Sequence, residues 1–190
     1  MFFDLIKETR TIRHFDRSVP VTEDEIAYIL ECARLTPSAA NLQRIRYGVI
    51  YEQGAPVTFS HVAFAGYLPA EQKPQADVAP VAYLIMLTEA SSPDLNLGID
   101  IGISAEAAVL AAREKGLGAC MIRSFDKEYF CGIFADTGFI PQLVVALGSP
   151  LEKAKVVSVE NGSIKYFKDA DKTNCVPKLS VENLLVKVVK

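Results

Sequence analysis

The sequence contains no tryptophan and only two histidines among its 190 residues, and its four cysteines form no C-x-x-C pair. Protein zinc sites combine cysteines and histidines at short spacings, and small secreted folds depend on many paired cysteines. The scarcity of these residues argues against a metal site and against a disulfide framework. We therefore expect no bound metal and four reduced, mostly buried thiols.

The sequence also lacks an excess of charge of one sign, because 20 basic residues face 23 acidic ones, for a net charge of −3. This balance gives no overall basic field for a nucleic acid or an anionic membrane. The longest stretch without Asp, Glu, Lys or Arg, residues 53–70, is interrupted by prolines and a glycine, whereas a membrane span needs about 20 mostly apolar residues. The first residues include acids where a secretory signal has a basic start. We expect no nucleic-acid partner, no membrane span and a cytoplasmic location.

Several catalytic motifs are missing as well. The sequence has no G-x-G-x-x-G, G-x-x-x-x-G-K-[ST], H-E-x-x-H or G-x-S-x-G segment. Neither His14 nor His61 has an obvious serine or cysteine partner, and no pair of carboxylates stands out from a solvated surface. The sequence therefore predicts no catalytic side chain.

What is present is the composition of a globular protein, with half of its residues apolar. No repeat or Gly/Ser linker divides the chain, so residues 1–190 are expected to form a single domain. Thr22 and Glu25 fit a capping box, which predicts a helix that ends near Leu35, because Pro37 disfavours helical geometry before it. Further helices are expected at residues 2–6, at 101–115, where the residues are apolar nearly all round, and at 126–134.

Strands are expected at residues 47–51, 78–88, 117–122 and 142–147, the second of them buried on both faces. Asn161-Gly162 predicts a hairpin between strands at residues 156–160 and 163–167, because both residues tolerate positive φ. The hairpin and the central apolar helix do not fit a simple βαβ series. The pattern therefore favours an α+β fold with a mixed or antiparallel central sheet packed by helices.

Arg10 and Arg13 lie three positions apart among threonines, directly after the first predicted helix. A guanidinium presents a fixed fork of donors and stays charged, which suits a phosphate. The alternative is a surface pair making salt bridges worth about 0–1 kcal/mol. The two residues alone favour the alternative.

Two further features involve small residues. The loop Thr36–Gln43 carries amides at Asn41 and Gln43, which can donate to and accept from the edge of a ring, although a helix cap and turn explains it as well. Gly116–Cys120 and Ala146–Pro150 place small residues at strand ends, where packing or turn geometry is a sufficient reason.

Taken in order, these features resemble the FMN-dependent nitroreductase family. The family's motifs are matched by Arg10–Phe15, by Pro37–Gln43, by Ala112–Gly118 at the end of the central helix and by Ala146–Pro150; Val176-Pro177-Lys178 is similar to a later family segment. The resemblance covers nearly the whole chain. It implies a nitroreductase-like α+β fold that forms an intertwined homodimer, with one FMN in each of two clefts at the interface.

The resemblance also implies a set of cofactor-binding residues. In one subunit these are Arg10, Thr11, Arg13 and Lys178, with the backbone of Gly118, Ala119 and Cys120 near the flavin. The other subunit would contribute Pro37, Ser38, Ala39, Asn41 and Gln43. Residues 168–190 are expected to be an extension that docks on the partner subunit.

The implied activity passes electrons from NAD(P)H through bound FMN to a small acceptor such as a nitroaromatic or quinone. The flavin carries the chemistry, which agrees with the absence of a catalytic side chain. One alternative is a flavin-binding or flavin-storage protein of the same fold with low turnover. Another is a thiol redox protein that uses Cys120 or Cys131, although neither has a resolving cysteine nearby in the sequence.

The sequence departs from the family pattern in three ways. Arg44-Ile45 replaces the frequent Pro-Trp, tryptophan is absent altogether, and Leu179 follows Lys178 where an arginine is common. Arg44 leads to the hypothesis that the cleft prefers an acidic acceptor, with a surface role as the alternative, and Leu179 predicts a lower flavin affinity. Residues 53–77 are expected to line or cover the cleft.

Overall fold

The computed structural model describes residues 1–64, 73–89 and 94–190. Its central sheet is built around one long strand, β5 (Ile140–Pro150), which pairs antiparallel with three others. These are β1 (Phe15–Asp16), β3 (Ala82–Thr88) and β4 (Gly118–Ile122), and β2 (Arg46–Tyr51) pairs antiparallel with β3. The predicted α+β fold with an antiparallel sheet is confirmed.

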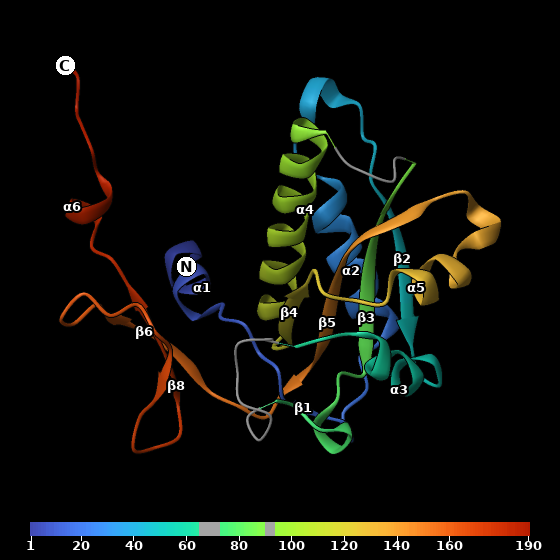
Figure 1. Cartoon of the computed structure of the whole chain (residues 1–190), viewed down its shortest axis with the longest axis horizontal. Helices are drawn as coiled ribbons and strands as arrows, with labels where there is room; N and C mark the ends of the chain where they lie inside the picture. Colours follow the sequence, from blue (N-terminus) through green and yellow to red (C-terminus); the bar gives the residue numbers. More distant parts are fainter. Residues whose placement is uncertain (65–72, 90–93) are drawn as a thin grey trace.

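Helices cover both faces of this sheet (Figure 1). Ala82, Leu84 and Met86 of β3 join a core cluster with α2 (Glu23–Arg34) and α4 (Leu95–Glu114). The alternate residues Tyr83 and Ile85 join a second cluster on the other face, beside α3 (Gly54–Thr58) and α5 (Lys127–Ile133). Every residue of β3 is buried, as predicted for a strand covered on both faces.

The ends of the elements follow local chemistry. The capping box of Thr22 and Glu25 is present at the start of α2. Residues 78–81 are not part of β3, because Pro80 has no N–H to donate to a sheet and a 3₁₀ turn, η4 (Ala76–Val78), precedes it. Other short helices are α1 (Phe2–Glu8), η1 (Ala39–Asn41), η2 (Phe59–His61), η5 (Ala135–Thr137) and α6 (Val181–Leu184).

The central helix α4 begins six residues earlier than predicted. Gly98 weakens the helix signal in this first part, but Asp94 accepts a hydrogen bond from the backbone N–H of Leu97 and caps the helix. By length and composition alone, α4 is apolar enough to cross a membrane. Half of that apolar window is buried inside the protein, as expected of the core helix of a folded domain.

The C-terminal part forms a second, three-stranded sheet, and here the predicted hairpin is wrong. Asn161 and Gly162 do form a tight turn with positive φ, but only one isolated bridge closes it. Instead, β6 (Ala154–Ser158) pairs in parallel with β8 (Asn174–Lys178), and β7 (Phe167–Lys168) pairs antiparallel with β8. Because β8 carries the buried Cys175 and Pro177, tertiary burial overrides the local turn signal. Beyond β8 the chain extends away from the body (Figure 1).

Candidate functional site

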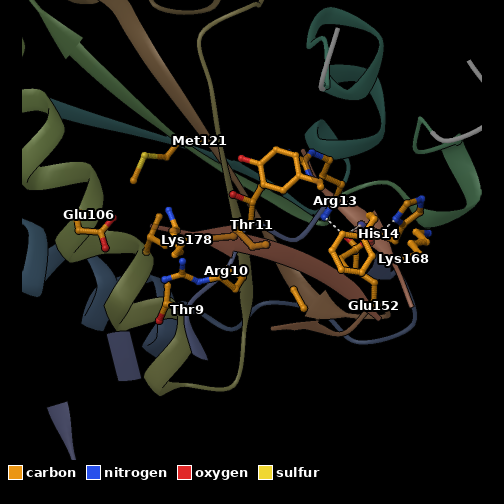
Figure 2. A pocket seen from close by; sticks show the side chains of 17 residues that line it. Thr9, Arg10, Thr11, Arg13, His14, Glu106, Met121, Glu152, Lys168 and Lys178 are labelled. Carbon is orange, nitrogen blue, oxygen red and sulfur yellow. Dashed lines mark hydrogen bonds and ion pairs between the residues drawn. The ribbon is translucent and has the colours of Figure 1, made fainter. Parts of the chain in front are cut away.

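A pocket of about 440 Å³ lies between the segment that follows α1, the middle of α4 and the C-terminal sheet. Its polar lining is mainly basic, with Arg10, Arg13, Lys168 and Lys178 against two carboxylates, Glu106 and Glu152. Figure 2 shows Arg10 and Lys178 near Glu106 on one side, and Arg13, His14 and Lys168 near Glu152 on the other. Four cations against two anions favour an anionic ligand.

The segment with the two arginines is held along the edge of β4. The N–H of Ile12 donates to the carbonyl oxygen of Ala119 at 3.0 Å, and Thr11 and Ala119 form a parallel bridge. Gly118 lies so close to Ile12 that a Cβ there would approach the Ile12 side chain to within 2.8 Å. The glycine therefore permits the close approach that places the arginine segment beside the pocket.

Only some of the hydrogen-bond donors of the Arg10 side chain have an acceptor in the described protein. Its Nη2 donates to the carbonyl oxygen of Ile6 at 2.7 Å, whereas its Nε is buried and has no hydrogen-bond partner among the described residues. A buried donor without an acceptor is costly, and an anionic oxygen in the pocket would supply one. This orphaned donor, together with the surrounding cations, fits the phosphate of a bound ligand.

Glu152 connects three segments around the pocket. Its Oε1 accepts from the backbone N–H groups of Arg13 and His14, and its Oε2 lies 3.0 Å from Nδ1 of His14 and accepts from Nδ2 of Asn174 at 2.7 Å. Burial by itself raises the pKa of this carboxyl group, but these hydrogen bonds outweigh burial and bring its pKa below the usual value. Glu152 is therefore an ionised acceptor inside a basic pocket.

The loop between α2 and β2 lies against the beginning of α4. The N–H of Ala39 donates to Oδ1 of Asp100 at 3.0 Å, and the Gln43 N–H donates to Oγ of Ser38 at 3.1 Å. Ala40, Asn41 and Gln43 all have φ near +50°, a conformation that ordinary residues adopt rarely. Such a fixed, strained backbone is typical of a loop that presents polar groups to a ligand or partner.

The model of the nitroreductase family matches residues 6–149, which is most of the chain. The chain belongs to the nitroreductase family. Members of this family are oxidoreductases, so the protein is an oxidoreductase by family.

Individual relatives of this nitroreductase-family chain are distant. It is 23% identical to a Bacillus subtilis (strain 168) protein named "Putative NAD(P)H nitroreductase YodC", over 80% of this chain and 90% of that protein. Its fold is similar to that of a nitroreductase family protein from Streptococcus pneumoniae TIGR4, with a TM-score of 0.70 at 19% identity over 99% of this chain and 100% of that one. An FMN-dependent nitroreductase from Clostridium difficile R20291 gives a TM-score of 0.64 at 19% identity, over 80% and 90% of the two chains.

The twelve residues singled out by the nitroreductase resemblance fall into four groups in the structure, of which Cys120 alone is the last. Arg10, Thr11, Arg13, Ala119 and Lys178 all line the basic pocket. Gly118 lies next to it, in an adjoining hollow that shares Arg10 and Ala119. The five residues of the loop are not among the described residues that line the pocket, and the loop contacts the first half of α4 through Ala39 and Asp100; they are Pro37, Ser38, Ala39, Asn41 and Gln43.

Cys120, the remaining predicted site residue, points into the second core cluster and is 5% exposed. Desolvation is the main cause that raises the pKa of its thiol to about 11. The thiol is therefore protonated at neutral pH and lies within the core, and Cys120 is not among the described residues that line the pocket. Burial and a high pKa also argue against the thiol redox alternative at this residue.

Arg44 forms an ion pair with Asp94 of its own chain. Its guanidinium donates two hydrogen bonds to Asp94, at 2.8 and 3.2 Å, and so ties the loop to the cap of α4. This pair gives Arg44 a structural contact within its own chain, as in the alternative that the sequence left open, and the preference for an acidic acceptor stays a prediction. Of residues 53–77, α3 and η2 pack on the second face of the sheet, and 65–72 lie outside the described residues.

Sequence reasoning missed several pocket residues. These are Thr9, His14, Glu106, Val109, Met121, Glu152, Ala154, Tyr166, Phe167, Lys168, Asn174 and Val176. The run Tyr166-Phe167-Lys168 combines aromatic and basic side chains, which can indicate a binding surface. It was overlooked because most of it fell in the predicted hairpin strand at residues 163–167. Glu152 gave no signal, because its function depends on three segments that meet only in the folded chain.

Proposed function

We propose that this protein is an FMN-dependent NAD(P)H oxidoreductase that reduces a small acceptor such as a nitroaromatic or quinone. The observation that carries this proposal is the cluster of Arg10, Arg13 and Lys178 in one pocket, together with the buried Nε of Arg10, which has no acceptor among the described residues. Those residues come from segments far apart in the sequence, and they are the ones that the family resemblance assigns to FMN. The Bacillus subtilis relative YodC bears the name "Putative NAD(P)H nitroreductase", and one structural neighbour is called an FMN-dependent nitroreductase.

The phosphate of FMN would lie among these cations. Arginine binds phosphate through parallel hydrogen bonds, and lysine adds a point charge. Thr11 provides a hydroxyl group for the ribityl chain, and the backbone at Gly118 and Ala119 allows the flavin to approach β4 closely. When bound, FMN supplies the redox chemistry by accepting a hydride from the nicotinamide and giving electrons to the acceptor. The chain's residues then bind, orient and shield the reactants.

The functional unit in this proposal is a homodimer. The loop that contains Asn41 and Gln43 lies away from the pocket of its own chain, so a second subunit would have to bring it to the flavin. The outward face of α4 carries the exposed apolar residues Leu95, Ile99 and Ile103 at helical spacing. In a single domain of residues 1–190, β8 pairs with β6 of its own chain, so the end of the extension 168–190 that lies beyond β8 would dock on the partner and cover its own exposed apolar side chains.

An absorbance spectrum of the purified protein, followed by anaerobic titration with NADH and with NADPH, tests the proposal. We expect a flavin spectrum that bleaches on addition of one nicotinamide, and steady NAD(P)H consumption when a nitroaromatic or quinone is added. A bound flavin that bleaches but turns over little would favour the storage protein instead. A protein that neither contains nor takes up FMN would contradict both.

A further inference from the structure

We propose that Glu106 is a specificity-determining residue whose negative charge weakens the binding of a phosphate beside Arg10. It thereby limits the preference of the pocket for FMN over riboflavin, which has no phosphate. This inference rests on the proposed function and concerns the charge at one end of the same pocket. Glu106 has the opposite effect from the cations that line the pocket with it.

The phosphate end of the pocket is the side that contains Arg10 and Lys178. The buried Nε of Arg10 lacks an acceptor there, and neither cation forms an ion pair with a carboxylate among the described residues. Figure 2 shows both side chains on one side of the pocket, together with Glu106. An anion bound at this end would therefore meet two cations and one carboxylate.

Glu106 does not hold these two cations in place. Within the described part of the chain, it makes no hydrogen bond or ion pair with Arg10 or Lys178. The Arg10 guanidinium instead donates to the carbonyl oxygen of Ile6 at 2.7 Å. Removal of the Glu106 charge should therefore leave both cations where they are and remove only the repulsion between this carboxylate and a nearby anion.

Glu106 lies on the outward face of α4. It follows the exposed apolar residues Leu95, Ile99 and Ile103 at helical spacing and is itself exposed in the single chain. In the proposed homodimer the partner would cover this face and exclude water from it. Because water and salt screen a charge less where they are excluded, the repulsion of a phosphate would be stronger in the dimer than in the single chain.

The charge of the ligand determines which flavin is affected. A phosphate monoester carries a charge of about −1.5 to −2 at neutral pH, whereas riboflavin is neutral. One exposed charge changes an affinity by up to about fivefold, and added salt reduces its effect, since the Debye length falls from about 10 Å at 0.1 M to about 3 Å at 1 M. The effect of Glu106 should therefore be confined to FMN and should disappear at high salt.

The test is fluorescence titration of flavin-free full-length protein with FMN and with riboflavin. Glu106→Gln keeps the shape of the side chain and removes its charge. We expect this variant to bind FMN about three- to fivefold more tightly than wild type at about 0.1 M salt, and less than about 1.5-fold more tightly at about 1 M salt. Its affinity for riboflavin should change by less than about 1.5-fold at either salt concentration.

Two further variants serve as controls. Glu106→Asp keeps the charge and should bind FMN within about twofold of wild type, because the repulsion depends on the charge. Glu128→Gln removes the same charge from an exposed position on α5, outside the pocket, and should leave both affinities unchanged. Thermal melting should show that all three variants are folded, since both substituted positions are exposed.

Three results would overturn the inference. These are weaker or unchanged FMN binding in Glu106→Gln, equal tightening of FMN and riboflavin, and a tightening that persists at high salt. Weaker binding in particular would show that Glu106 holds the cations in place. A wild-type protein that binds neither flavin would instead contradict the proposed function, and the inference would fail with it.

Discussion

Arg10 is the residue expected to contribute most clearly to the affinity of the pocket for an anion. Its buried Nε lacks an acceptor in the described protein, so a phosphate oxygen gains a hydrogen bond to a charged donor. Arg10→Ala should weaken FMN binding by about 1.5–3 kcal/mol, or roughly 10- to 100-fold, in a fluorescence titration. Arg34→Ala is the control, because Arg34 is exposed and pairs with Glu31 on α2. Equal losses in both variants would contradict a specific role for Arg10.

Cys120 gives a prediction about pH. Its thiol has a pKa of about 11, and only the thiolate reacts with alkylating reagents. Since the folded pKa lies above that of a free cysteine, the reactive fraction at about pH 8 is smaller than in the unfolded chain. Iodoacetamide should therefore leave Cys120 unmodified in the native protein and modify it in urea, as peptide mass spectrometry would show. Rapid modification of Cys120 in the native protein would contradict this prediction and would support the thiol redox alternative.

At the scale of elements, the close contact between β4 and the arginine segment is the most sensitive point. A methyl group at Gly118 would collide with Ile12, and overpacking of this kind costs about 1–3 kcal/mol. We expect Gly118→Ala to lower the free energy of unfolding by that amount in urea denaturation and to weaken FMN binding as well. Gly132→Ala is the control, because nothing lies within 4 Å of a Cβ at Gly132 in α5. Equal stability of the two variants would show that the segment adapts freely.

The start of α4 predicts an acid-dependent contribution to stability. The hydrogen bond from Arg44, the largest cause, lowers the pKa of Asp94 to about 2 from its ordinary 3.8. The folded pKa is the lower one, so the stabilisation is present above the ordinary value and is lost as the pH falls toward about 2. Asp94→Asn should lower the melting temperature at neutral pH, and its difference from wild type should shrink between pH 3.8 and about 2. A difference that is independent of pH would contradict this assignment.

The elements also show what the sequence can predict. Period and capping located α2, α5, β2 and β4 to within a few residues, because those signals are local. The prediction of a hairpin at Asn161-Gly162 was wrong, because β6 pairs with the partly buried strand β8 instead. A local turn signal contains no information on which strand will be buried. The start of α4 was missed because Gly98 obscured a helix that tertiary packing stabilises.

The site was predictable only in part for a similar reason. Arg10 and Arg13 carry a local pattern, and the resemblance to a family added Lys178 from far along the chain. Glu152 and Asn174 have no local pattern, because they matter only where three segments meet. The identity of the acceptor has no signal in the residues that line the pocket, since one flavin site serves unrelated reactions.

Several large apolar side chains are exposed to solvent when the chain is considered as a monomer. Val186 is 98% exposed and Leu95 80% exposed, and α1 buries none of its residues. Exposed apolar groups of this extent indicate an interface. Light scattering should give twice the 20.8 kDa chain mass. Removal of residues 179–190 should shift the mass toward that of one chain, and an unshifted dimer would show that the extension does not dock on the partner.

In the proposed dimer, one subunit supplies the arginines of each FMN site and the other supplies the loop that contains Asn41. Mixing two variants tests it directly: Arg10→Ala with Arg13→Ala in one chain, and Asn41→Ala with Gln43→Ala in the other. If each variant alone fails to bind FMN, random mixed dimers should recover about one quarter of the wild-type FMN sites, because half of the dimers are mixed and each has one intact site. No recovery in dimers shown to be mixed would mean that a single subunit forms the whole site, and the shared site would be wrong.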